Sequence, residues 1–287
     1  MIKRFVLIFK NLKKMRAGYI SLLFTLILSS CGYNTFNYFY SGNDVEQRIK
    51  GFTDLQKIEI LDPKYDVLVL TDIHFDSFIK EFNQQDFFQY LDKNPNFKFC
   101  LILGDVVNLG KEVEYQKYKK FTDKIQNEYN IPVFTSIGNH DLYHNGWKFW
   151  KKYVYPHATL YRFKTTNFSW YCIDTGTGSI GKTQFELLSE YMLKDENKKV
   201  IFTHYPIFND KFIFEMQDST EVNLLFSLFA KSETKLILNG HVHESLSHEN
   251  QYFTEKTISS LLHSNAIGII HVDEEKETIS FEELTYK

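Results

Sequence analysis

Apolar residues fall along this chain in short runs that alternate with longer mixed stretches. Six runs are rich in β-branched and aromatic residues and are bounded by polar residues or glycine, which is typical of β-strands. They are Asp66–Thr71, Lys98–Leu103, Pro132–Ile137, Phe168–Asp174, Lys199–Thr203 and Lys235–Leu238. Three later runs predict a closing set of antiparallel strands, at Gln251–Thr257, Ala266–Val272 and Thr278–Glu282.

Stretches of helical character separate the earlier strands. We predict helices over Phe78–Asp92, Lys111–Tyr129, Trp147–Tyr155, Thr183–Lys194 and Val222–Lys231. In the second of these, Val113, Tyr115, Tyr118, Phe121 and Ile125 recur near the helical period. The alternation of strand and helix predicts an α/β fold. Because no internal repeat or long linker interrupts residues 61–287, we expect them to form one domain.

The first thirty residues have a different pattern, which is typical of an export signal. Six basic residues and no acidic residue accompany an apolar stretch from Ala17 to Leu28. A helix needs about 20 apolar residues to cross a bilayer core, so this stretch is too short to span one. It does fit the apolar centre of a signal peptide, and residues 1–30 are therefore predicted to be one.

The end of that stretch, Leu28-Ser29-Ser30-Cys31-Gly32, resembles the lipobox of bacterial lipoproteins. In that family the chain is cut before the cysteine, which then carries the lipid. The resemblance implies lipid attachment at Cys31, a tether over residues 31–60, and export to the bacterial cell envelope as a membrane-anchored lipoprotein. An ordinary signal peptide, or an uncleaved anchor with a chance cysteine, is the alternative.

Composition and charge exclude several classes of function. A chain of 287 residues that is 43% hydrophobic and 24% charged can bury a sizeable core and is not disordered. Removing the six basic residues of the signal leaves 27 basic against 36 acidic residues, a net charge of about −9. Such a domain has no electrostatic footprint for nucleic acid. Cys100 and Cys172 lie in apolar runs and are predicted to be buried thiols.

Polar residues follow five of the predicted strands, at the sheet edge where α/β proteins bind ligands. The segments are Thr71-Asp72-Ile73-His74, Gly104-Asp105-Val106-Val107-Asn108, Gly138-Asn139-His140-Asp141, Thr203-His204-Tyr205-Pro206 and Asn239-Gly240-His241-Val242-His243. In an extended chain, residues i and i+2 point to the same side. Asp72 and His74 are therefore expected to converge on one ion, and His241 and His243 likewise if their segment is extended.

These donor groups indicate a transition-metal site. Imidazole, carboxylate and amide oxygen suit a divalent ion such as Mn, Fe or Zn, and the set contains no thiolate of the kind that holds structural zinc. A glycine before three of the polar residues allows the chain to turn sharply and approach closely. The five motifs, in this order from about Asp66 to Val272, resemble the calcineurin-like metallophosphoesterases. The resemblance implies a four-layer α/β/β/α sandwich that binds two divalent metal ions.

The resemblance also implies a role for each motif residue. The first metal would be held by Asp72, His74 and His243. The second metal would be held by Asn139, His204 and His241. Asp105 would bridge the two metals, and a metal-bridging hydroxide would attack a small phosphoester, either a monoester or a diester. His140 would donate a proton to the leaving group or stabilise the phosphoryl group, and Asp141 would orient His140.

Two positions bear on the kind of substrate. Protein phosphatases of this family carry an Asp-Arg pair after the Gly-Asp, whereas this chain has Asn108-Leu109, which puts protein-phosphatase activity in doubt. Asn108 is a candidate to support the site from outside the ligand set. The apolar and aromatic segment Tyr205–Asp218 is either a substrate-side lip or an ordinary packed loop.

Two other functions compete with this interpretation. Residues 176–183 match the Gly-x₄-Gly-Lys-Thr nucleotide-binding loop between a predicted strand and a predicted helix. Such a loop works with a later strand ending in Asp, whereas the later strands here end in His204 and in Asn239-Gly240. The other alternative is a non-catalytic metal-binding scaffold. Outside the motifs, Asp76 is expected in a solvated loop, and the remaining histidines in loops, surface or core: His144, His157, His248, His263 and His271.

Overall fold

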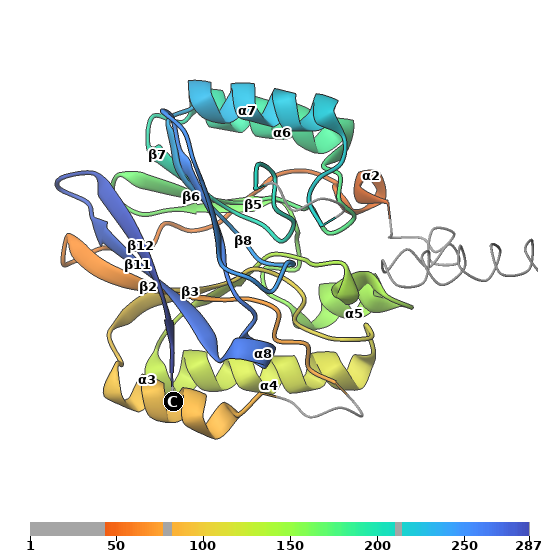
Figure 1. Ribbon diagram of the computed structural model, residues 1–287, viewed down its shortest axis with the longest axis vertical. Helices are drawn as coiled ribbons and strands as arrows, with labels where there is room; N and C mark the ends of the chain where they lie inside the picture. Colours follow the sequence, from red (N-terminus) through yellow and green to blue (C-terminus); the bar gives the residue numbers. More distant parts are fainter. Residues whose placement is uncertain (1–43, 77–81, 210–213, 287) are drawn as a thin grey trace, which may run out of the picture. The chain divides into compact units, whose positions relative to one another are not determined.

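The computed structural model describes residues 44–76, 82–209 and 214–286, so the predicted signal peptide and Cys31 lie outside the described residues. Two β-sheets lie face to face between two layers of helices (Figure 1). The five-stranded sheet has the order β12 (Thr278–Thr285), β11 (Ala266–Asp273), β2 (Lys64–Leu70), β3 (Phe97–Ile102) and β4 (Val133–Thr135). The seven-stranded sheet has the order β1 (Thr53–Asp54), β5 (Tyr161–Lys164), β6 (Phe168–Cys172), β7 (Lys198–Phe202), β8 (Thr234–Asn239), β10 (Thr254–Thr257) and β9 (Leu246–Glu249).

Side chains of each central strand are buried on both faces, which explains why these strands read as continuous apolar runs. On β2, Val67 and Val69 pack between the two sheets, while Leu68 and Leu70 face the opposite way, toward helices. The layer between the sheets is filled by aromatic rings. Phe99 on β3 lies 4.9 Å from Trp170 on β6, measured between ring centroids, in an edge-to-face arrangement.

Helices cover both outer faces of the sheets (Figure 1). The five-stranded sheet is covered by α3 (Gln84–Lys93) and α4 (Glu112–Tyr129), with α5 (Gly146–Tyr153) packed beside them. The seven-stranded sheet is covered by α6 (Gly181–Lys194) and α7 (Ser219–Lys231). The short helices η2 (His140–Leu142) and α8 (Leu261–Ser264) lie in connections. The predicted four-layer α/β/β/α sandwich is thus confirmed.

Residues 44–60, expected to belong to the tether, are part of the fold. Helix α2 (Val45–Arg48) buries Val45 against α6, and β1 pairs in parallel with β5. Arg48 donates from Nε and Nη2 to the two oxygens of Asp174, both at 2.8 Å, and both side chains are fully buried. The folded domain therefore begins by residue 44 rather than at residue 61. Single buried residues such as Val45 and Arg48 in a polar segment produce no periodic pattern of apolar residues. The sequence prediction therefore placed the start of the domain too late.

The last strands are also arranged differently from the expectation. Strand β10 pairs in parallel with β8 and antiparallel with β9, in the seven-stranded sheet. Only β11 and β12 form the expected antiparallel pair, and they belong to the other sheet. The chain crosses between the sheets through α8, and it contains three strands that were not predicted, β1, β5 and β9.

Cys100 on β3 and Cys172 on β6 are buried free thiols, as predicted, and burial raises the pKa of each. Within the described part of the chain, no helix is long and apolar enough to cross a membrane.

Candidate metal centre

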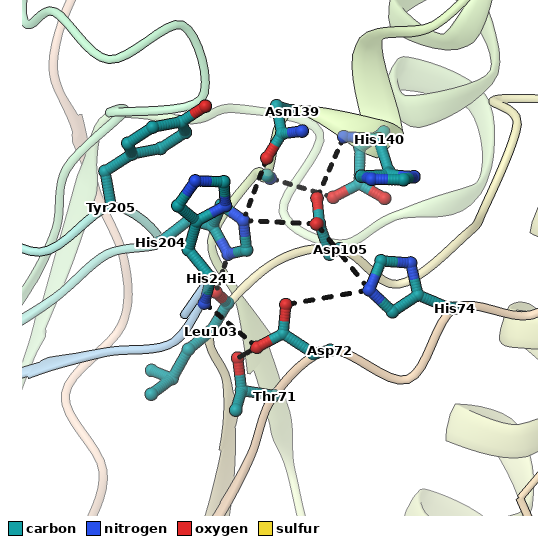
Figure 2. A network of polar contacts seen from close by, with 12 residues as sticks. Thr71, Asp72, His74, Leu103, Asp105, Asn139, His140, His204, Tyr205 and His241 are labelled. Atoms are coloured by element: carbon teal, nitrogen blue, oxygen red, sulfur yellow. Dashed lines mark hydrogen bonds and ion pairs between the residues drawn. The ribbon is translucent and has the colours of Figure 1, made fainter. Parts of the chain in front are cut away.

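The carboxyl ends of strands from both sheets bring the predicted donors together (Figure 2). Strands β2, β3 and β4 lead into Asp72, Asp105 and Asn139, and strands β7 and β8 lead into His204 and His241. Among the residues that the structure describes, three groups have donor atoms within 4.8 Å of one another: Asp72 with His74 and His243, Asp105 with His204 and His241, and His74 with Asp105 and His140. Asn139 joins the second group, because its Oδ1 lies 3.2 Å from His204 Nε2.

Left-handed backbone conformations aim most of these side chains. Positive φ angles occur at Asp72 (51°), His74 (48°), Asp105 (49°), His241 (68°) and His243 (62°). This conformation is costly for residues other than glycine, and it clusters at functional sites. Asp72 and His74 do converge, but not because the chain is extended. For His241 and His243 the extended geometry was wrong, and the two rings enter different groups.

The first group brings one carboxylate oxygen and two imidazole nitrogens into close contact. His243 Nε2 lies 3.3 Å from His74 Nε2 and 3.2 Å from Asp72 Oδ1. Asp72 Oδ1 and His74 Nδ1 are buried, and neither has a hydrogen-bond partner among the described residues. The other oxygen of Asp72 accepts from the Thr71 hydroxyl at 2.8 Å and from the His241 N–H at 3.0 Å. Only Oδ1 is therefore left to face the neighbouring imidazoles.

Asp105 links the two groups through a single oxygen. Its Oδ2 lies 3.7 Å from His74 Nε2 and 3.3 Å from His204 Nε2. Its Oδ1 accepts from the backbone N–H of His140 at 2.9 Å, which fixes the orientation of the carboxylate. His204 is oriented in the same way, because its Nδ1 donates to the Leu103 carbonyl at 2.8 Å and leaves Nε2 for the site.

Charges within the centre shift its pKa values in opposite directions. Burial raises the pKa of Asp105, but the charges of His204 and His140 outweigh burial and hold it below its usual range. Burial lowers the pKa of His204, but the adjacent Asp105 raises it to about 9. Burial, together with His204, lowers the pKa of His241 to about 3. The carboxylate is thus ionised and His241 neutral, the forms in which both groups bind a cation, and the raised pKa of His204 reflects the negative charge of Asp105 beside it.

Three glycines allow the loops to come this close. A Cβ atom on Gly138 would collide with the carboxylate of Asp105, and one on Gly240 would collide with the side chains of Thr71 and Asp72. A Cβ atom on Gly104 would collide with the backbone of Gly138 and the side chain of His204, and its φ of +91° is rarely adopted by other residues. The glycines singled out by the motifs therefore serve close approach at all three positions, and backbone conformation as well at Gly104.

The donor set fits divalent metal ions. Ligand atoms bonded to one ion at about 2.0–2.2 Å stand about 3.0–3.5 Å apart, which is the spacing of the closest donor pairs in both groups. Nitrogen and oxygen donors without thiolate suit Mn, Fe or Zn. A buried Asp72 oxygen without a hydrogen-bond partner in the described structure is costly unless a cation is bound nearby.

The sequence pattern of the calcineurin-like phosphoesterases matches residues 65–245, which contain every predicted metal ligand. The chain belongs to this family. It is therefore a metal-dependent phosphoester hydrolase, with divalent ions as cofactors and a small phosphoester as the implied substrate. A comparison with curated proteins found no match.

Solved structures place this phosphoesterase within a widely shared fold. A dimetal phosphatase from Danio rerio superposes with a TM-score of 0.58 at 11% identity, covering 79% of this chain and 100% of that one. GAP50, the anchor in the inner membrane complex of Plasmodium, gives 0.53 at 17% identity, with coverage of 78% and 89%. A putative 5'-nucleotidase from Staphylococcus aureus gives 0.51 at 14% identity, with coverage of 76% and only 53%. At these identities the likeness concerns the fold alone.

His140 lies in the centre, but the residue that orients its ring is not the expected Asp141. Its Nδ1 donates to the backbone carbonyl of Asn108 at 2.8 Å, so Asn108 orients the ring from its main chain. Asp141 does not take this role. Its Oδ1 accepts from the N–H groups of Val106 and Val107 at 2.9 and 3.1 Å, and its Oδ2 accepts from Gly138 at 2.8 Å. Asp141 ties two loops of the phosphoesterase together instead.

Asp76 was wrongly expected to be solvated. It is 3% exposed, and its Oδ2 accepts a hydrogen bond from the side-chain amide of Asn108. A charged residue directly after a motif is typical of a solvated turn, so the contact between Asp76 and Asn108 could not be predicted from the sequence. Asp76 therefore helps to fix the Asn108 segment that orients His140.

The histidines outside the motifs lie mostly at the surface, as expected. His144, His157 and His271 are exposed, and His248 is partly exposed. His263 is also exposed, but its ring centroid lies 5.1 Å from that of His243, beside the first group. Its place beside the centre could not be predicted from the motifs, because α8 brings it back from a distant part of the chain.

The segment 176–183 that matches a nucleotide-binding loop has several of its backbone N–H donors already occupied. Glu221 accepts from the N–H groups of Ile180 and Gly181 at 3.0 Å each, and Glu46 accepts from Thr183 at 3.1 Å. In a nucleotide-binding loop such donors hold phosphate. Lys182, the residue that would contact the phosphates, is 84% exposed and lies beside Glu186. The geometry thus argues against nucleotide binding at this loop.

Lys182→Ala is expected to leave phosphoester hydrolysis within about twofold of the unaltered enzyme, since exposed side chains outside the site contribute little. Steady-state kinetics with a chromogenic phosphoester would measure the effect. A collapse of activity would overturn the assignment of this segment as a structural turn.

Proposed function

We propose that this phosphoesterase uses two metal ions to hydrolyse small phosphoesters. Asp72, His74 and His243 would hold the first ion, and Asn139, His204 and His241 the second. The observation that carries the proposal is the position of Asp105 Oδ2, between His74 Nε2 of one group and His204 Nε2 of the other. One oxygen within reach of both donor groups is what a bridging ligand requires.

When bound, a pair of Mn, Fe or Zn ions supplies a nucleophile at neutral pH and stabilises charge on the phosphoryl oxygens. The side chains of the protein hold the ions and the proton. Since Nδ1 of His140 is committed to Asn108, Nε2 is the atom that presents a proton to the leaving-group oxygen. Because Nδ1 keeps its own proton, a proton on Nε2 requires the imidazolium form of His140. Burial lowers the pKa of His140, so this form is the minor one at neutral pH but releases its proton readily.

Metal dependence is the first test of this proposal. The fragment comprising residues 33–287 should turn over chromogenic phosphomonoesters or phosphodiesters with Mn²⁺ and lose this activity in chelator. Restoring Mn²⁺ should restore the rate. The comparison of monoester with diester would then define the substrate class. Two bound metals without turnover would indicate a more selective substrate, whereas no turnover and no bound metal would favour the non-catalytic scaffold.

We also propose that the enzyme acts at the bacterial cell envelope, anchored by a lipid on Cys31. The support is the sequence of residues 28–32, which follows a basic and apolar segment of signal-peptide type. Cys31→Ser should move the protein from the membrane fraction to the soluble fraction or block its processing. An unchanged membrane fraction with unchanged mass would contradict the lipid anchor.

A further inference from the structure

Two aromatic side chains lie beside His241, at the partly open side of the centre. The Tyr205 ring stacks on the His241 ring, with centroids 3.8 Å apart and planes 27° apart. The Phe214 ring lies 6.0 Å from the same imidazole. Figure 2 shows Tyr205 next to His241 and His204. Phe214 is 43% exposed, so a large apolar ring remains in contact with solvent beside polar donors.

Backbone hydrogen bonds hold the residues that follow Tyr205 and the residue two positions after Phe214. Glu255 on β10 is fully buried and accepts from the N–H groups of Ile207, Phe208 and Asn209 at 2.8, 2.9 and 2.6 Å. The Met216 N–H donates to the Pro206 carbonyl at 3.0 Å. These contacts hold the turn that carries Tyr205, and they tie the segment just after Phe214 to that turn.

Exposure distinguishes Phe214 from an ordinary packing residue. A scattered exposed phenylalanine is common on protein surfaces, but this one adjoins the donor group proposed for the second metal. The centre is closed at its floor, where Asp72 is fully buried, and is more open at its rim, where His241 and His243 are only partly buried. A phosphoester reaching the metals from the rim would bring its organic group past the rings at His241.

We propose that Tyr205 and Phe214 form an aromatic wall that selects phosphoesters carrying a flat, apolar organic group. This inference rests on the proposed function. Stacking on such rings adds to the free energy gained from burying apolar area. Together these effects should give a ligand with a phenyl group about tenfold higher affinity than one with a methyl group. The position after the second motif holds Asn108-Leu109 and so supplies no cationic side chain for the substrate. An apolar contact to the organic group is a means of selection that needs no such cation.

The test compares benzylphosphonate with methylphosphonate on the metal-loaded enzyme. The two share the same head group and differ by the phenyl ring, and neither has a leaving group, so differences in chemistry do not enter. The inhibition constant for chromogenic turnover and the dissociation constant from calorimetry should both be about tenfold lower for benzylphosphonate. Phe214→Ala should reduce the preference to threefold or less. Tyr252→Ala, which removes a ring 44% exposed on the β9–β10 hairpin, is the matched control and should keep the preference.

The possible outcomes separate this inference from the proposed function. Equal affinity for the two phosphonates in an enzyme with metal-dependent turnover would overturn the wall alone. A preference that survives in both Phe214→Ala and Tyr205→Leu would overturn it too. If these variants lost the second metal while the preference remained, the rings would only support His241. Absence of metal-dependent turnover together with absence of phosphonate binding would overturn the proposed function itself.

Discussion

Asp105→Asn is expected to reduce kcat/KM by about 10³-fold or more and to lower the bound metal from two ions toward one. Asparagine has nearly the same shape, so it can still accept the His140 N–H that Asp105 Oδ1 accepts at 2.9 Å. Its amide nitrogen then replaces Oδ2, the oxygen that lies between His74 and His204. An amide nitrogen has no lone pair available for a metal, so the bridge and its negative charge are both lost.

Kinetics and elemental metal analysis on the same preparations would measure this effect. Asp66→Asn is the matched control, because Asp66 is an exposed carboxylate on β2 whose partner is His271. Thermal unfolding of both variants would show whether either has lost its fold. An Asp105→Asn enzyme with two metals and ordinary turnover would remove Asp105 from its proposed role.

The donor residues could be predicted from the sequence because each sits directly after an apolar strand. Several parallel strands place their carboxyl ends at one edge, so the order of motifs along the chain was enough to bring Asp72, Asp105 and His204 together. The backbone that aims them was not predictable from spacing. Left-handed φ angles at His241 and His243 direct the two rings into different groups, whereas an extended chain would direct both to one side.

Contacts between polar residues that are far apart along the chain could not be predicted from the sequence either. Arg48 and Asp174 are 126 positions apart, and neither lies in a periodic pattern that would mark it as buried. Glu255 appears in a polar stretch of β10, yet it is fully buried and holds three backbone N–H groups. Apolar periodicity identifies core faces, but it carries no information about which buried charges have partners, so the anchors of the loops were found only in the structure.

His140→Ala is expected to lower kcat/KM by about 10²–10³-fold for an alkyl phosphoester, and much less for a p-nitrophenyl ester. An alkoxide is a poor leaving group and needs a proton as its bond to phosphorus breaks, whereas p-nitrophenolate is stable without one. The ring has the orientation that this role needs, because the Asn108 carbonyl accepts a hydrogen bond from Nδ1–H and Nε2 is left to face the centre.

The dependence on the leaving group separates this role from a structural one. His144→Ala is the matched control, since His144 is an exposed histidine of the same loop whose Nδ1 donates to the Leu109 carbonyl at 3.0 Å. Both substrates should be hydrolysed at nearly unchanged rates by that variant. Equal losses for the alkyl and p-nitrophenyl esters in His140→Ala would mean that His140 stabilises the phosphoryl group rather than protonating the leaving group. Loss of metal in that variant would instead place His140 among the groups that hold the ions, consistent with its closeness to His74 and Asp105.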